Sequence, residues 1–507
     1  MKNKYLYSWI VLVLFLNVSC DSGFDALNTD KTNLTSLEPV LQVNNAIVNS
    51  GFNWSNSLCE TTIVRQGISP FTGLLTCANV NQDNKSMTSE NWNRYFGANV
   101  IRELTDAINN TDQSSNVHHM ARIWRAYAFM VTTDTYGDVP YSEAGLGFSD
   151  NIIFPGYDSQ EQIYTGANGI LEELVDATSS LDLSQAADSR DLLYGGNVEQ
   201  WKRLGNSLLL RAAMRLTKIA PDLAEQYVGI AVAGGIMHDN NDSAVIRHTS
   251  DFRNAVGTQF NGGEAANYYL DEVFINFLKD NNDPRLASIA VRYVGAESGT
   301  DQTEARADRS PDNQIGMPQG YDSNNIGRVA EEAGLSSFYA YSQIDRSTIH
   351  GTESPTYLVT HAQTQLLMGE AVVRGWIDGD ASELYSEGIK AHMQQFSDYG
   401  TRTLIDQNDI DSYLQANPLE AGNELEQINT QYWVVSFMNG PEAWANFRRS
   451  GYPDLPPNPL SGDLQSEEFI RRLTYPDSEY SVNNEHLREA VNKQGPDNLN
   501  TRVWWDI

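Results

Sequence analysis

The residue types that carry enzyme chemistry are present in this chain, but they do not occur at the spacings of familiar catalytic motifs. The 507 residues contain no HExxH, GxSxG, GxxxxGK[ST] or CxxC pattern, which are the signatures of zinc proteases, serine hydrolases, nucleotide-binding loops and dithiol redox sites. The 66 acidic residues always allow some carboxylate pair at the distance that glycoside hydrolysis needs. Their abundance alone therefore indicates no enzyme, and a surface glycoside hydrolase is the least favoured alternative.

Candidate metal ligands are equally weak. His118 and His119 form the only adjacent histidine pair and lie near the start of a predicted helix, where neighbouring side chains point to different faces. Adjacent positions suit tetrahedral ligation poorly. The acid-rich runs at 239–242 and 280–283 lack the spaced oxygen ligands of a calcium loop. We therefore expect solvated turns there, and neither a metal nor another cofactor.

The first twenty residues indicate export. Lys2 and Lys4 precede an apolar run from Tyr5 to Leu16, and Asn17-Val18-Ser19-Cys20 comes next. This order is typical of a bacterial lipoprotein signal, and the run is shorter than the about 20 apolar residues that span a bilayer. We predict a signal peptide at 1–19 and a lipid anchor on Cys20, although Asn17 occupies the place where this motif usually has Leu. An uncleaved anchor or a plain secretory signal is the alternative.

Composition restricts the partners and the redox state of the chain beyond the anchor. The formal charge of −32 repels phosphate backbones, so we expect no nucleic-acid partner. Besides Cys20 only Cys59 and Cys77 remain, and export would place both in an oxidising compartment. A disulfide between them would close a short loop and contribute about 3 kcal/mol. Two buried free thiols are the alternative, because a sequence does not give the distance that decides between them.

The dominant periodicity is helical. Apolar or small residues follow Trp201 at spacings of three and four, as far as Ile219. A second helix is predicted to start at Ser354-Pro355, and the break at Gly375–Asp380 separates it from a third. An earlier pair is predicted at 92–109 and 116–136. Several such pairs predict a mostly α fold of tetratricopeptide-like hairpins stacked as a right-handed solenoid. A long irregular insertion at about 295–347 and other loops would carry the ligand surface.

Several local sequences resemble one family. The resemblance rests on these segments, in order along the chain: Ile123 to Ala126 (IWRA), Thr133 to Ala144 (TDTYGDVPYSEA), Trp201 to Arg215 (WKRLGNSLLLRAAMR), Glu370 to Trp376 (EAVVRGW), Trp444 to Pro453 (WANFRRSGYP), Arg472 to Pro476 (RLTYP) and Trp504 to Asp506 (WWD). They are similar to segments of SusD/RagB-like outer-membrane lipoproteins, and they occur in that family's order over residues 20–507.

The resemblance implies one SusD-like domain at 20–507, anchored to the outer membrane at the cell surface. It implies a non-catalytic lid over a SusC-like TonB-dependent transporter that captures oligosaccharides, or peptides in a RagB-type alternative. The matched motifs are interpreted as architectural. Gly137 and Pro140 would form a tight turn in which Asp138 caps a local N–H, and Arg448 and Arg449 would anchor buried carboxylates.

No motif fixes the ligand contacts, so they are predicted from chemistry. A sugar ring presents an apolar C–H face that stacks on flat aromatic side chains. The candidates are rings in the predicted loops, and each has a core-packing alternative: Trp54, Phe71, Trp92, Tyr321, Phe338, Tyr339 and Tyr341.

Overall fold

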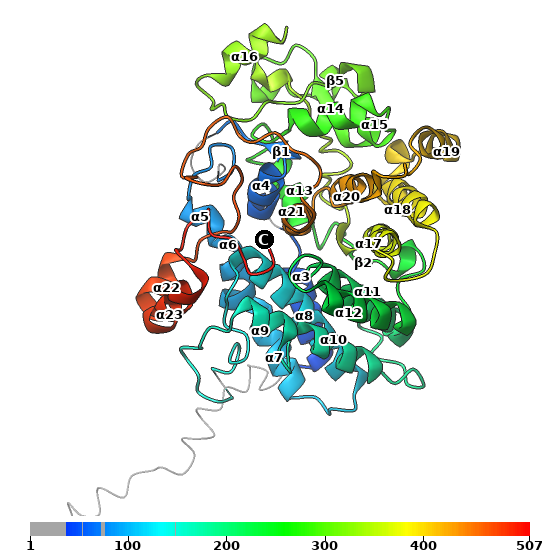
Figure 1. The fold of residues 1–507 in the computed structure, drawn as a ribbon. Helices are drawn as coiled ribbons and strands as arrows, with labels where there is room; N and C mark the ends of the chain where they lie inside the picture. Colours follow the sequence, from blue (N-terminus) through cyan, green and yellow to red (C-terminus); the bar gives the residue numbers. More distant parts are fainter. Residues whose placement is uncertain (1–36, 53, 72–76, 148) are drawn as a thin grey trace, which may run out of the picture. The chain divides into compact units, whose positions relative to one another are not determined.

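The computed structural model is mainly helical, and several of its helices pack in pairs (Figure 1). Helices that follow one another in the chain pack together in these pairs: α7 (Ile101–Asn109) with α8 (Asn116–Tyr136), α10 (Ile170–Ser179) with α11 (Val198–Met214), α11 with α12 (Pro221–Gly234), α17 (His361–Val373) with α18 (Ala381–Gln395), and α20 (Glu424–Val435) with α21 (Gly440–Ser450). The mostly helical prediction is confirmed, and the right-handed stacking remains a prediction.

The structure describes residues 37–52, 54–71, 77–147 and 149–507, and for residues 54–58, 98 and 99 it describes the backbone alone. Pro39–Ile507 forms one compact unit. The predicted leader at 1–19 and Cys20 lie outside the described residues. Within the described part of the chain, no helix is both long and apolar enough to cross a bilayer.

Shorter elements connect the main helices. The remaining helices are α3 (Pro39–Asn49), α4 (Trp54–Ile63), α5 (Lys85–Thr88), α6 (Glu90–Trp92), η1 (Asn93–Asn99), α9 (Gln160–Thr165), η2 (Asn240–Asp242), α13 (Ala255–Phe260), α14 (Glu272–Asp280), α15 (Arg285–Ile289), η3 (Gly299–Asp301), η4 (Glu304–Arg306), η5 (Pro311–Asn313), α16 (Ile326–Glu332), η6 (Phe338–Ala340), η7 (Phe396–Tyr399), η8 (Thr401–Thr403), α19 (Gln407–Ala416), α22 (Asp477–Val482) and α23 (Asn484–Gln494).

In the part of the chain that the structure describes, the strands are short and form three small sheets. β1 (Gly67–Ile68) pairs with β3 (Tyr269–Leu270), and β2 (Ala244–Ile246) pairs with β7 (Thr356–Val359), both antiparallel. In the third sheet β4 (Ala290–Tyr293) lies between β5 (Ala307–Asp308) and β6 (Gln343–Ile344). Each sheet therefore joins segments that are distant in the sequence.

One helix start was predicted wrongly. The helix expected from Ser354-Pro355 begins instead at His361, and Thr356–Val359 is strand β7. β-Branched and aromatic residues favour a strand at this position, and β2 supplies the backbone partner. Thr360 then caps α17, since its hydroxyl accepts from the Gln363 amide at 3.1 Å while Gln363 bonds back to the cap.

The segment 295–347 contains short helices and two strands rather than one continuous loop. Figure 1 draws this segment in green, with α16 and β5 near α14. Ile326, Ala330 and Leu335 of the segment pack with Ile68 and Tyr269 into a separate small hydrophobic cluster. The segment is thus folded around its own core and joined to the β1–β3 sheet.

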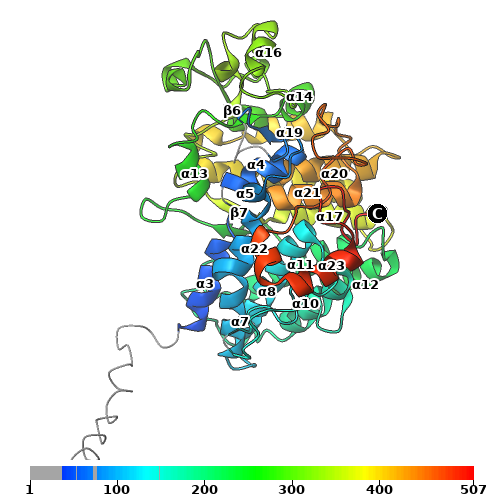
Figure 2. The same cartoon turned by 90° about the vertical axis from the view of Figure 1, so that its left-hand side faces the viewer.

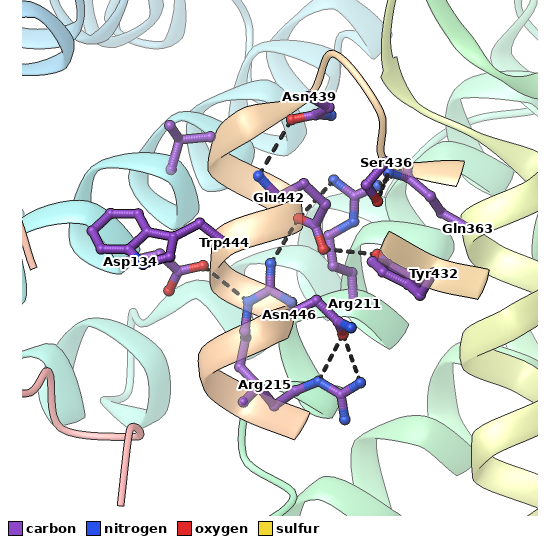
Figure 3. A network of polar contacts seen from close by, with 12 residues as sticks. Asp134, Arg211, Arg215, Gln363, Tyr432, Ser436, Asn439, Glu442, Trp444 and Asn446 are labelled. Carbon is purple, nitrogen blue, oxygen red and sulfur yellow. Dashed lines mark hydrogen bonds and ion pairs between the residues drawn. The ribbon is translucent and has the colours of Figure 1, made fainter. Parts of the chain in front are cut away.

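A buried ionic network holds the hairpins together (Figure 3). Arg215 directly follows α11. Its Nε donates to Asp134 of α8 at 3.0 Å, and its Nη2 donates to Glu442 of α21 at 2.6 Å. Arg211 lies 3.3 Å from the same Glu442 carboxylate, and the Tyr432 hydroxyl donates to it at 2.7 Å. Although burial alone would raise the pKa of Glu442, Arg211 and Arg215 hold that pKa below its ordinary value.

A second buried pair links α17 to α21, which lie near one another in Figure 2. Both terminal nitrogens of Arg449 donate to the Glu370 carboxylate at 2.7 Å, as predicted for Arg449. The prediction for Arg448 is wrong. Arg448 has no carboxylate within ion-pair distance among the described residues. It instead donates to the backbone oxygens of Asp134 and Arg471 and stacks over the Trp444 ring at 3.7 Å.

The predicted turn after α8 forms, but with a different partner for its aspartate. Gly137 ends α8 with φ of 80°, a conformation that favours glycine. Asp138 accepts a hydrogen bond from the backbone N–H of Gln160 at 2.9 Å, 22 residues further along the chain. The cap therefore ties two helices together instead of closing a local turn.

Candidate ligand-binding face

A contiguous set of aromatic rings lies where the β1–β3 sheet meets η6. The Phe71 ring meets Phe338 edge to face at 6.1 Å between centroids, and Phe338 stacks on Tyr339 at 4.2 Å. Tyr269, which is buried, meets Phe338 from below at 6.4 Å. Phe71, Phe338 and Tyr339 are each partly exposed. We call these three residues the aromatic face.

Backbone chemistry explains why Phe338 and Tyr339 adopt this position. Ser337 caps η6 by accepting a hydrogen bond from the Tyr339 amide at 3.1 Å. The Ser336 and Ser337 hydroxyls both donate to the Ala296 oxygen, at 3.1 and 2.8 Å. The two rings are therefore carried on a turn that is fixed at its first residue.

Gln302 holds the same turn from beneath. Its side-chain nitrogen donates to the Tyr339 backbone oxygen at 2.9 Å and reaches the Tyr269 hydroxyl at 3.5 Å. Arg346 lies over the Tyr293 ring at 5.2 Å and donates to the Gln302 backbone oxygen at 3.2 Å. These contacts give the face a buried polar support.

On the other side of the aromatic face, hydrogen bonds of the Asn79 side chain hold the backbone in place. Its side-chain nitrogen donates to the backbone oxygens of Ser69 and Tyr321, both at 2.8 Å, and its oxygen accepts from the Gly320 amide at 3.0 Å. One side chain therefore connects the segment before Phe71 to the segment that carries Tyr321. Tyr321 is half-buried and packs against the small cluster under the face.

Cys59 and Cys77 form a disulfide with a Cα–Cα distance of 5.5 Å. The bond joins α4 to the chain just before Asn79, so it fixes the base of the segment that contributes Phe71. Both sulfurs are buried.

The predicted ligand contacts fall into three groups. Phe71, Phe338 and Tyr339 are brought together, and Tyr321 lies on the same cluster. Trp92 and Tyr341 are only 4% and 1% exposed, so neither ring is available for stacking in this conformation. The Trp54 side chain lies outside the described residues, although its backbone starts α4. Ligand contact by any of these residues remains a prediction.

Trp92 and Tyr341 have structural surroundings that explain their burial. Trp92 packs against Phe96 at 4.5 Å and Tyr136 at 5.4 Å. Tyr341 packs in the small cluster with Ile68, Tyr269 and Met317, and this burial raises its pKa to about 12. In both cases the ring packs in a hydrophobic core, although the sequence around it is typical of a loop.

Sequence reasoning missed the supporting residues Tyr269, Gln302 and Arg346. Tyr269 belongs to a two-residue strand, which is too short for a period-two pattern. Gln302 and Arg346 lie in an irregular stretch where polar residues are common. No sequence signal marked them.

The face has the chemistry of a binding site. Phe71, Phe338 and Tyr339 offer apolar ring surface. The side-chain nitrogens of Gln302 and Asn79 donate to backbone oxygens, whereas the buried Oε1 of Gln302 has no partner among the described residues. Among the described residues, no group of three or more His, Cys, Asp or Glu side chains is arranged to hold a metal ion. His118 and His119 are buried in α8.

A comparison with protein-family models gives one match, and a comparison with curated proteins gives none. The matching family is described as "SusD-like_2: Starch-binding associating with outer membrane", and its model matches residues 31–476. This range includes the aromatic face and most of the buried ionic network.

Solved structures resemble this fold over nearly its whole length. One, described as a chitin-binding protein, is 28% identical with a TM-score of 0.80, and the match covers 93% of this chain and 100% of the other. A Bacteroidetes AC2a SusD-like protein is 26% identical with a TM-score of 0.79 and the same coverage. A chitin-binding SusD homolog from Flavobacterium johnsoniae is 25% identical with a TM-score of 0.73, covering 92% and 97%.

Proposed function

Because the chain belongs to the SusD-like family, described as starch-binding and associating with the outer membrane, we propose that it is a non-catalytic surface protein that captures oligosaccharides on its aromatic face. The observation that carries this proposal is the contiguous set of Phe71, Phe338 and Tyr339, partly exposed and linked ring to ring. The C–H faces of sugar rings stack on such surfaces, while the surrounding hydroxyls remain hydrated.

The supporting contacts favour a preformed site. The hydrogen bonds of Gln302 and Ser337 fix the turn that carries Phe338 and Tyr339. A preformed surface loses less conformational entropy on binding than a mobile one. By analogy with aromatic pairs, each ring would contribute about 0.5–1.5 kcal/mol. Three rings and a few hydrogen bonds correspond to affinities of about micromolar to millimolar.

The same proposal includes the cellular setting. A signal peptide at 1–19 and a lipid on Cys20 would hold residues 20–507, as one SusD-like domain, at the outer surface of the outer membrane. The domain would act as the lid of a SusC-like TonB-dependent transporter that imports the captured ligand. The basic start, the short apolar run and the cysteine of the leader support this setting.

The ligand class is tested by calorimetric titration with chitin and starch oligosaccharides, because two similar structures are described as chitin-binding and the family as starch-binding. We expect one series to bind, and Phe338→Ala to weaken that binding about 2- to 10-fold. Phe252→Ala is the matched control, since Phe252 is 37% exposed and paired with His248 elsewhere on the chain.

Three results would contradict the proposal. Equal affinity of the Phe338→Ala variant would exclude the aromatic face as the site. Binding of peptides but of no oligosaccharide in the same titration would favour the RagB-type alternative. Steady release of reducing ends from a polysaccharide by the purified protein would show that it is an enzyme.

A further inference from the structure

A second concave site lies away from the aromatic face, between the start of α9, the end of α23 and the C-terminal segment. It is a pocket of about 240 Å³. Drug-sized ligands usually occupy about 300–1,000 Å³. The pocket is therefore suited to a ligand of a single ring.

One wall of the pocket is the ring of Trp504, which is half-buried against the core. Its indole N–H has no hydrogen-bond partner among the described residues. Buried Trp N–H groups usually find a partner, so a half-open one at the wall of a pocket is a donor available to a ligand.

The rim carries charged groups of both signs. Arg502 is held by ion pairs to Glu467 and Asp506, which leaves Lys493 and Glu161. Lys493 and Glu161 both line the pocket and are exposed. Neither side chain takes part in an ion pair or hydrogen bond within the described part of the chain. The rim thus offers one cationic donor and one anionic acceptor, a combination that suits hydroxyl groups, which both donate and accept.

The floor of the pocket contains a polar atom without a partner. Gln160 is fully buried, and its nitrogen donates to the Thr133 oxygen at 2.7 Å, but its Oε1 has no partner among the described residues. A buried polar atom that lacks a hydrogen bond costs about 1–3 kcal/mol. Beside it, Asp138 uses one carboxylate oxygen for the Gln160 amide. Burial raises the pKa of Asp138.

We propose that this pocket is a second carbohydrate subsite, which holds one sugar ring stacked on Trp504. Hydroxyl groups of the ring donate to Asp138, Gln160 and Glu161 and accept from Lys493. The site is independent of the aromatic face, and its existence does not require that the face binds a glycan. It would bind a single unit weakly, in the millimolar range.

The test uses ligand-observed saturation-transfer NMR on the purified protein with glucose, N-acetylglucosamine and glucosamine as probes. In the Phe338→Ala background, which weakens any signal from the aromatic face, we expect at least one of them to receive saturation from the protein, and Trp504→Ala to reduce that signal at least tenfold. Trp376→Ala is the matched control, because Trp376 is another half-buried tryptophan, located beside α17. The control, in the same background, should keep the signal.

Two rim substitutions keep the proposal testable if Trp504→Ala does not fold. Lys493→Met and Glu161→Gln change exposed side chains, and the double variant should weaken binding of the responding sugar several-fold. No saturation transfer to any of the three sugars would overturn the proposal. Full signal in folded Trp504→Ala, or in the double variant, would overturn it as well.

Discussion

The buried network around Glu442 and the aromatic face around Phe338 are both built from aromatic and polar side chains, yet they differ in how those side chains are used. In the network, Arg215 and Arg211 satisfy Asp134 and Glu442 inside the protein. On the face, Gln302 and Asn79 satisfy backbone groups, and the rings remain partly open. In the first arrangement the charged groups bind one another, whereas the second leaves ring surface for another molecule.

The recognisable sequence motifs belong to the first region. Asp134 precedes the Tyr-Gly-Asp-Val-Pro string, Arg215 ends the α11 motif, and Trp505 of the closing motif donates to Asp134 at 2.9 Å. Glu370 and Arg449 come from two further motifs and bind each other. The motifs therefore meet in the core and fix the packing of the hairpins, while the candidate ligand surface contains none of them.

The largest expected effect is on stability, from Arg449→Leu. The substitution leaves Glu370 fully buried without its bidentate partner, with Arg374 at 2.8 Å as its remaining cation. Breaking a buried pair on one side costs up to about 3–5 kcal/mol. Urea unfolding measures the loss. Arg328→Leu is the control, because its pair with Glu332 is exposed, and it should change stability by less than about 0.5 kcal/mol. A loss below about 1 kcal/mol for Arg449→Leu would contradict the architectural role.

A pH series tests the cost of a second buried carboxyl group, that of Glu60 on α4. Burial raises the pKa of this carboxyl to about 8, and one of its oxygens has no partner among the described residues. Because the folded pKa lies above the ordinary value of 4.5, the unfolded chain loses the proton first as pH rises. Glu60 therefore destabilises the fold progressively between about pH 4.5 and 8.

Glu60→Gln removes this titration while it keeps the shape of the side chain. Relative to the unchanged protein, the variant should gain stability with rising pH, by up to about 1.4 kcal/mol per pH unit in that window. Urea unfolding at about pH 4.5, 6 and 7.5 measures the difference. If the free energies of unfolding of the variant and the unchanged protein differed by the same amount at all three pH values, Glu60 would be ionised in the folded protein.

On the aromatic face, the double variant Phe338→Ala/Tyr339→Ala should affect binding more than folding. Loss of two stacking surfaces weakens oligosaccharide binding by about 1–3 kcal/mol. The half-open rings contribute less to the core than the buried residues beneath them. If the variant instead unfolded at much lower urea concentration with unchanged affinity, the rings would be structural.

Gln302→Leu is expected to give the smallest effect. It removes the side-chain hydrogen bonds to the Tyr339 oxygen and the Tyr269 hydroxyl, each of which contributes about 0.5–1.5 kcal/mol to the position of the turn. Oligosaccharide affinity should fall about 2- to 5-fold, and titration calorimetry measures it. Gln365→Leu, a substitution on α17 away from the face, should leave the affinity unchanged.

Helical periodicity and the matched motifs predicted the helical class and the Arg449 anchor, because both depend on regular spacing or on distinctive strings. Thr356–Val359 was missed as a strand because its partner, Ala244–Ile246, is distant in the sequence. Arg448 was misassigned because its partners are backbone oxygens, which leave no signal in side-chain identity.

The candidate site was predictable only in part. Aromatic residues in irregular segments indicated Phe71, Phe338 and Tyr339, but the same criterion selected Trp92 and Tyr341, which are buried. The exposure of a ring depends on the residues that pack over it, and those residues come from segments that are distant in the sequence. Trp504 stood out in the sequence only as part of a family motif, although its position at a pocket results from the approach of α9 and α23.

The most direct test is to titrate the Phe338→Ala/Tyr339→Ala variant with the oligosaccharide that binds the unchanged protein, and to record urea unfolding of the same sample. The account predicts an affinity loss of about 5- to 100-fold with an unfolding midpoint close to that of the unchanged protein. Unchanged affinity in a folded sample would contradict it.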